Sequence, residues 1–116
     1  MKPVHYERTV LGHPISATLS DIGEDLLVQV TGGCAPHVGS VSIGYPADGG
    51  IATEKLLLPT HRDDVVGDLF ARTLAQRLGR KVTVICGIHY DAPGKDGLAQ
   101  IVACAQALLD DILYDL

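Results

Sequence analysis

The stretch that decides the fold is Val82–Ile88, with the sequence VTVICGI. It is a nearly continuous apolar run, which is typical of a strand buried on both faces. Before it, residues 65–78 carry apolar side chains at the spacing of one helical face, and Gly79 suits the position just past a helix end. The pattern predicts an amphipathic helix that leads into a central strand.

Upstream of this helix the apolar pattern has a period of two. Residues 4–11 and 14–20 alternate around Gly12 and predict a hairpin, and three further strands are predicted at 25–31, 38–44 and 51–58. Downstream, residues 98–116 keep the helical period. The predicted order is β-β-β-β-β-α-β-α, which indicates an α+β fold with a single mixed, largely antiparallel sheet and two helices packed on one face.

Composition narrows the classes of function. The 116 residues suit one domain, 1–116, and 47% apolar with 20% charged residues is ordinary for a globular protein. The net charge of -5 makes nucleic acid an unexpected partner. We expect no membrane span and no signal peptide, and the odd number of cysteines, 3, favours a reducing cytoplasm.

The predicted topology gathers chemically useful side chains at one edge of the sheet. If strands one to five form an antiparallel meander and the helix returns the chain by a right-handed crossover, the loops after strands one, three, five and six open together. Four of the five histidines then share that edge, and His5 lies near the opposite one. The edge is predicted to hold His13, Cys34, His37, His61, Arg62, Asp63, His89 and Asp91.

Two kinds of site suit such an edge. Neutral imidazoles of His37, His61 and His89 are able to ligate a divalent metal, with Asp63 or Asp91 as a further ligand or hydrogen-bond acceptor. Alternatively, the edge binds an anion.

For an anion, the positive end of the helix that starts near Thr60, together with Arg62, suits a phosphate. Gly33, in the Gly-rich segment Thr31–Gly33, would let a ligand approach the backbone closely.

Ordinary structural roles explain the same residues. Thr60 and Asp63 match a helix-capping pattern, and Gly33 suits a turn. Each histidine is individually explained as a loop, helix-start or strand-end residue. Cys34 and His37 have a spacing that zinc uses, but no second ligand pair completes a structural site, so we interpret Cys34 as a bystander thiol.

Three linked segments resemble the LpdD-like family, whose members accompany UbiD-type decarboxylases. The segments are 31–41, which contains Pro36-His37 in a P-H-x-G motif, 58–64, which contains His61-Arg62-Asp63, and 84–91, which ends in G-I-H-Y-D. At position 60 this sequence has Thr where the family is expected to have Gly. The resemblance implies a cofactor-binding set of Gly33, Pro36, His37, His61, Arg62, Asp63, His89 and Asp91.

The resemblance also implies a function: a homodimeric chaperone that binds prenylated FMN and assists its delivery to, or maturation in, a UbiD-family decarboxylase. A flavin prenyltransferase is a second partner that it suggests, and the chain itself is not expected to be an enzyme. Two alternatives stay open. One is a small metal-dependent hydrolase or isomerase that uses His37, His61 and His89, and the other is a non-catalytic dimeric interaction module.

Overall fold

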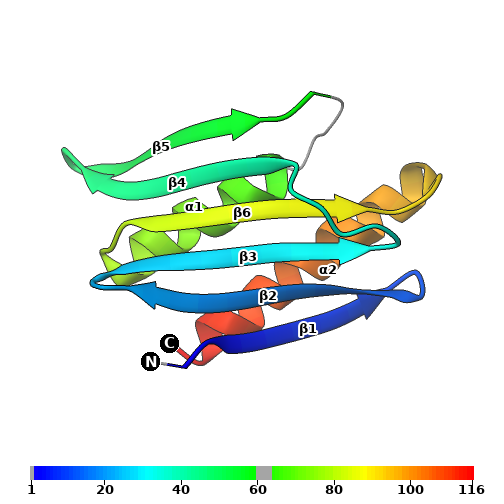
Figure 1. The fold of residues 1–116 in the computed structure, drawn as a ribbon, viewed down its shortest axis with the longest axis horizontal. Helices are drawn as coiled ribbons and strands as arrows, with labels where there is room; N and C mark the ends of the chain where they lie inside the picture. The colour runs from blue at the N-terminus through cyan, green and yellow to red at the C-terminus, as the bar shows by residue number, and fades with distance from the viewer. Residues whose placement is uncertain (1, 60–63) are drawn as a thin grey trace.

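The computed structural model of the chain describes residues 2–59 and 64–116. Figure 1 shows one sheet with two helices behind it. Along the chain the elements are β1 (Val4–Val10), β2 (His13–Ile22), β3 (Asp25–Gly33), β4 (Ser40–Ala47), β5 (Gly50–Leu57), α1 (Asp64–Leu78), β6 (Val82–His89) and α2 (Gly94–Tyr114). The predicted order and fold class are confirmed, with element ends displaced by a few residues.

The six strands are ordered β1-β2-β3-β6-β4-β5 across the sheet. β6 pairs in parallel with β3 and antiparallel with β4, so the predicted uninterrupted meander of strands one to five is wrong at the step from β3 to β4. The apolar run of β6 suits a central position with a strand on either side. Only its helix-facing side chains, Val82, Val84 and Cys86, are completely buried, so the predicted burial on both faces is wrong. The directions of the strands are nevertheless as predicted, because inserting β6 reverses none of them.

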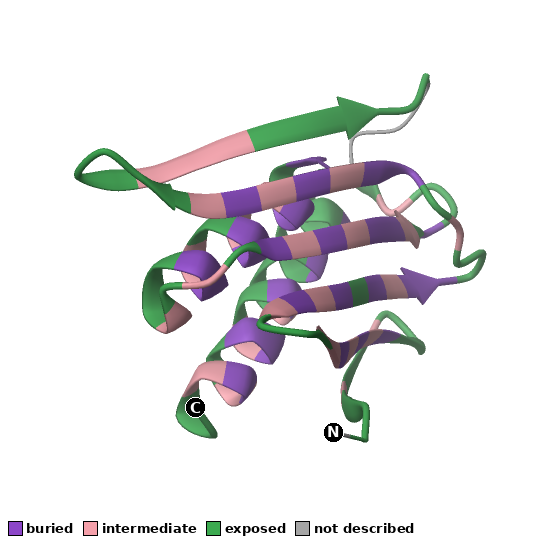
Figure 2. Ribbon diagram, turned by 60° about the vertical axis from the view of Figure 1, so that its left-hand side comes forward, coloured by how far each residue is buried: buried purple, intermediate pink, exposed green. Residues whose placement is uncertain are grey.

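Both helices cover the same face of the sheet, and the core lies between these two layers (Figure 2). α1 packs against β4, β5 and β6, and α2 packs against β1 and β2. The side chains of Phe70 and Leu74 on α1 and of Leu108 and Ile112 on α2 are completely buried. Each such burial stabilises the fold by about 1.5–3 kcal/mol.

Gly79 ends α1 as predicted. Its φ of 62° is left-handed, which glycine adopts without strain, and its N–H donates to the carbonyl oxygen of Ala75 at 2.8 Å. α2 is, by length and composition, apolar enough to cross a membrane, but so are the core helices of many soluble proteins. Here its apolar stripe is buried against the sheet, with Ile101, Leu108 and Leu109 in the core.

Candidate functional site at the loop end of the sheet

One end of the sheet, which we call the loop end, is where β1, β3, β5 and β6 terminate. The connection from β3 to β4, residues 34–39, has to pass over β6 there, because β6 separates the two strands (Figure 1). It passes over the face that the helices leave uncovered, at Gly87, where a Cβ atom would overlap the carbonyl oxygen of His37. A glycine at position 87 therefore makes the crossing possible.

Backbone hydrogen bonds fasten this crossover loop at both ends. The N–H of Cys34 donates to the carbonyl oxygen of His89 at 2.7 Å, and that of Gly39 donates to Cys86 at 2.8 Å. Leu58, just past β5, donates to the carbonyl oxygen of Gly39 at 2.9 Å. Segments that are far apart in the sequence are thus joined through their backbones. The side chains of the loop make none of these connections.

The half-buried His37 ring has a defined orientation. Its Nδ1 lies 3.0 Å from the carbonyl oxygen of Ala35, two residues earlier. A carbonyl oxygen only accepts, so Nδ1 carries the proton and Nε2 of the neutral ring has acceptor character. The loop therefore positions an imidazole of known tautomer at the loop end.

His89 and Asp91 form an exposed imidazole–carboxylate pair. Nε2 of His89 lies 2.9 Å from Oδ1 of Asp91, and the two side chains are 51% and 80% exposed. An exposed pair of this kind contributes at most about 1 kcal/mol to stability, so its polar groups are not needed to hold the fold. The pair is instead a polar surface feature that a ligand can contact.

Tyr90, between these two residues, points the other way and is buried. Its hydroxyl donates to the carbonyl oxygen of His13 at 2.8 Å, and its ring meets the His13 ring edge-on, with centroids 6.0 Å apart. Burial raises the pKa of Tyr90 above its ordinary value, so the hydroxyl stays a donor. Tyr90 thereby ties the β1–β2 turn to the end of β6.

The remaining predicted residues are placed as follows. Pro36 and Cys34 are exposed in the crossover loop. Gly33 has a φ of 84°, and the space beside it is filled by the carbonyl oxygen of His89, which gives this glycine a role in strand packing. His61, Arg62 and Asp63, with Thr60, lie outside the described residues, so the capping, phosphate and metal predictions that depend on them stay predictions.

Sequence reasoning missed two residues of this end, Gly87 and Tyr90. The signal for Gly87 was a glycine inside an otherwise apolar strand, which indicates a close backbone approach. Within residues 2–59 and 64–116, no three His, Cys, Asp or Glu side chains are arranged to hold a metal ion. His37 and His89 therefore need a partner outside those residues to form the predicted metal site.

Apolar side chains accompany the polar groups of the loop end. Val38 in the crossover loop is 54% exposed, and Leu57 and Leu58 at the end of β5 are 36% and 39% exposed. Leu58 donates its N–H to the carbonyl oxygen of Gly39, next to Val38, so these two aliphatic side chains and the His37 ring belong to the same part of the loop end. Apolar and polar groups together suit a ligand that has an apolar ring system and polar edges, while Arg62, expected at a phosphate, lies outside the described residues.

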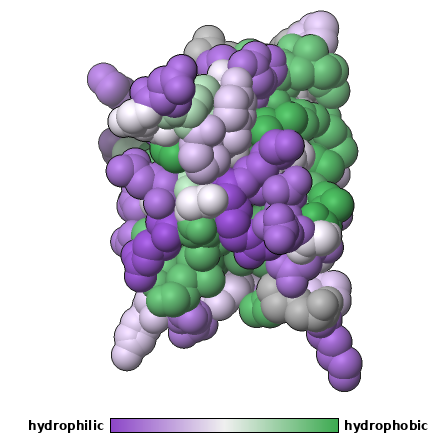
Figure 3. All heavy atoms as spheres, turned by 90° about the vertical axis from the view of Figure 1, so that its left-hand side faces the viewer, coloured by the Kyte–Doolittle hydropathy of each residue, from purple (hydrophilic) through white to green (hydrophobic). Residues whose placement is uncertain are grey.

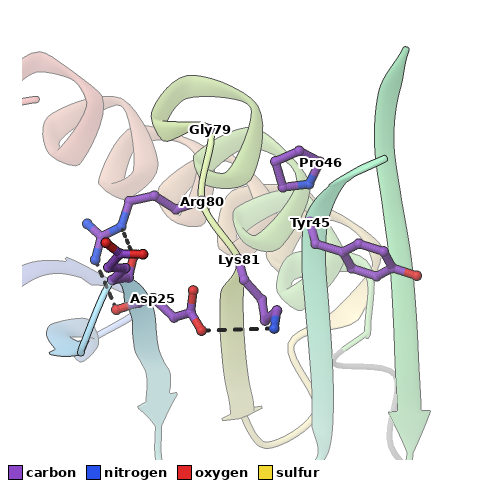
Figure 4. Close-up of a pocket in the computed structure, with 7 residues that line it drawn as sticks. Asp25, Tyr45, Pro46, Gly79, Arg80 and Lys81 are labelled. Atoms are coloured by element: carbon purple, nitrogen blue, oxygen red, sulfur yellow. Dashed lines mark hydrogen bonds and ion pairs between the residues drawn. The ribbon is translucent and has the colours of Figure 1, made fainter. Parts of the chain in front are cut away.

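The opposite end of the sheet, which we call the turn end, has a hollow of about 700 Å³ (Figure 4). It is lined by Glu24, Asp25, Tyr45, Pro46, Gly79, Arg80 and Lys81. The Arg80 guanidinium is occupied by three acceptors, the carbonyl oxygens of Glu24 and Asp25 and a carboxylate oxygen of Asp21. The hollow is open and both of its cations, Arg80 and Lys81, already face a carboxylate, so we place the candidate site at the loop end.

Comparison with known proteins identifies the family of this chain. Residues 9–116 match the family model of the prenylated flavin chaperone LpdD-like domain. Protein LpdD of Lactiplantibacillus plantarum is 32% identical over 106 residues, which cover 87% of this chain and 73% of that protein.

The fold also has a solved counterpart. A chain in the crystal structure of a chaperone complex for yeast 20S proteasome assembly has a TM-score of 0.52, with 17% identity over 97% of this chain and 94% of that one. At this identity the likeness concerns the fold alone. The match of the family model over nearly the whole chain, together with the identity to Protein LpdD, shows that this chain belongs to the LpdD-like prenylated flavin chaperone family.

Proposed function

We propose that this chain binds prenylated FMN at the loop end and assists its delivery to, or maturation in, a UbiD-type decarboxylase. Membership of a chaperone family supports an accessory role with a partner protein. The identity of the cofactor and of the partner is our inference, and a flavin prenyltransferase is the expected source of the cofactor.

The observation that carries the proposal is the interlocking of two of the segments that resemble the family. The P-H-x-G loop lies on Gly87 of the G-I-H-Y-D segment, and a hydrogen bond of 2.7 Å from Cys34 to His89 closes the contact. A rigid backbone that presents His37, His89 and Asp91 beside exposed aliphatic groups is suited to hold a ligand without transforming it. A carrier needs affinity for its cargo, whereas a catalyst needs interactions that strengthen in the transition state.

In this proposal the polar groups contact the edges of the ring system, and Val38 and Leu58 contact its apolar surface. Prenylation adds an apolar ring to FMN, so the chain should bind prenylated FMN more tightly than FMN. All three cysteines lie in the described part of the chain and none is in a disulfide, which suits the cytoplasmic location that we propose.

Reconstitution of a decarboxylase tests the role. The apo form of a cognate UbiD-type decarboxylase is loaded with prenylated FMN in the presence and absence of this chain, and both turnover and bound flavin are measured. We expect a higher fraction of active holoenzyme with the chain present and no turnover by the chain alone. Turnover by the chain alone would support the enzyme alternative, and an unchanged holoenzyme yield would leave the interaction module.

A further inference from the structure

The face of the sheet opposite the helices has two unlike halves. Side chains alternate between the two faces of the sheet along each strand. Residues that pair with the buried positions of β3 and β6 point to the helices, and the residues between them point away. On β1, β2 and β3 the outward side chains are mostly polar: His5, Glu7, Ser16, Thr18, Gln29 and Thr31. On β6, β4 and β5 they are mostly apolar: Ile85, Val41, Ile43, Tyr45, Ala52 and Leu56.

We name the second set the apolar half-sheet. Its members are neighbours: Val41 pairs with Leu56 on one side and with Ile85 on the other, so three aliphatic side chains form a row across three strands. In Figure 3 the uncovered face of the sheet forms the right margin, and hydrophobic residues gather in its upper part, at the level of these strands. Leu56 is 61% exposed.

In strand β4 the usual alternation of a sheet with one solvent-facing side is reversed: polar side chains point to the helices and apolar side chains point away from them. Its inward side chains are Ser40 and Ser42, both fully buried, and its outward ones include Val41 and Ile43. The close packing of α1 explains why the inward residues are small, since a Cβ atom on Gly67 would lie 3.2 Å from the hydroxyl oxygens of both serines. It does not explain why the outward residues are aliphatic, when the outer face of an antiparallel sheet is ordinarily polar.

We propose that the apolar half-sheet is the interface with a second copy of this chain, so that two sheets face each other with the helices outside. The first argument is composition. Permanent homodimer interfaces are more apolar than transient ones and are depleted of charged side chains. The outward side chains of β6, β4 and β5 include one charged group, the Glu54 carboxylate, and the Tyr45 hydroxyl of the half-sheet donates to it at 2.9 Å.

The second argument is size and symmetry. The molecule measures 40 × 28 × 20 Å, and the sheet faces along the shortest axis. The whole face has roughly 1,100 Å² in projection, so an interface that buries about 800 Å² on each partner would be centred on the apolar half-sheet and would extend onto the neighbouring strands. A two-fold axis places the same patch of both copies in contact. An uncharged aliphatic patch can face its own copy, because it needs no complementary charges.

Matched glutamate substitutions test the proposal. Leu56 in the half-sheet and Leu98 on the outer side of α2 are 61% and 57% exposed, so a single chain should tolerate Leu56→Glu and Leu98→Glu equally well. Sedimentation equilibrium of the full chain should give twice the mass of 12.3 kDa for the unsubstituted protein and for Leu98→Glu. Leu56→Glu should raise the dissociation constant at least about 100-fold, because it places a carboxylate in an apolar interface.

Circular dichroism and thermal unfolding of each variant establish that it is folded. A second variant, Ile43→Glu, should act like Leu56→Glu. A monomeric unsubstituted protein, a dimer that survives Leu56→Glu, or a dimer that Leu98→Glu dissociates would each overturn the proposal. The result is independent of the proposed cofactor, because a monomer would still present the loop end for flavin binding.

Discussion

The two ends of the sheet use their polar groups in opposite ways. At the turn end, side chains hold the structure: Arg80 donates to the carbonyl oxygens of Glu24 at 2.6 Å and Asp25 at 2.9 Å, and to the Asp21 carboxylate at 3.0 Å. At the loop end, backbone groups and the buried Tyr90 hydroxyl hold the structure, and His89 and Asp91 point outward with more than half of each side chain exposed.

This difference separates stability from binding. Substituting side chains at the turn end should lower the free energy of unfolding. Substituting the exposed side chains of the loop end should lower ligand affinity and leave the free energy of unfolding nearly unchanged. A change to the backbone packing of the loop end should affect both, since the crossover loop positions His37.

The largest effect is expected for Gly87→Ala. The new Cβ atom would overlap the carbonyl of His37, so either the crossover loop or β6 has to move. We expect the free energy of unfolding to fall by about 2–4 kcal/mol. Urea unfolding measures it.

The control for this change is Gly50→Ala. A Cβ atom there meets nothing within 4 Å, and the backbone of Gly50 is not in the left-handed region. Its free energy of unfolding should change by less than about 0.5 kcal/mol. Equal effects of the two substitutions would contradict the packing of the loop against Gly87.

A smaller loss is expected for Arg80→Ala. The substitution removes three hydrogen bonds, and the side chain is 29% exposed, so solvent partly compensates. The expected loss in the free energy of unfolding is about 1–2 kcal/mol. Lys81→Ala is the matched control, because its ion pair with Asp25 measures 4.0 Å and its side chain is 59% exposed. If Lys81→Ala lowered the stability in thermal unfolding more than Arg80→Ala, the stabilising role at the turn end would belong to Lys81 and not to Arg80.

A loss of about 1 kcal/mol is expected for Tyr90→Phe, which removes the hydrogen bond to the carbonyl oxygen of His13 and retains the buried ring. Tyr114, which is 81% exposed, provides the control Tyr114→Phe, with no measurable change. Chemical unfolding measures the free energy of unfolding of both variants. If Tyr90→Phe were neutral, the β1–β2 turn would not depend on this contact.

Much of the fold was predictable because side-chain periodicity is local. The apolar run Val82–Ile88 indicated a central strand, and the alternating segments indicated the other five. The neighbours of β6 were not predictable, because pairing is decided by distant contacts. The loop that joins β3 to β4 is long enough to pass over β6. A hairpin with a loop of this length would show the same sequence pattern, so the pattern did not distinguish the two arrangements.

The site was partly predictable for the same reason. Strand directions follow from the number of turns along the chain, so His37, His89 and Asp91 were expected at the same end of the sheet. The structure places all three there. The contact of Tyr90 with His13 links residues 77 positions apart, and no local pattern indicates it. His61, Arg62 and Asp63 lie outside the described residues and stay predictions.

The central claim, that the loop end binds prenylated FMN, is tested most directly by titrating the cofactor into four proteins: the unsubstituted chain, His37→Ala, His89→Ala and His5→Ala. His5 lies on β1, is 57% exposed and contacts Thr18, so it is a matched histidine away from the site. Fluorescence measures affinity, and thermal unfolding measures stability. We predict at least about tenfold weaker binding for His37→Ala and His89→Ala, equivalent to about 1.4 kcal/mol, with an unchanged midpoint and no effect of His5→Ala. Unchanged affinity in both loop-end variants, or no binding by the unsubstituted chain, would contradict the account.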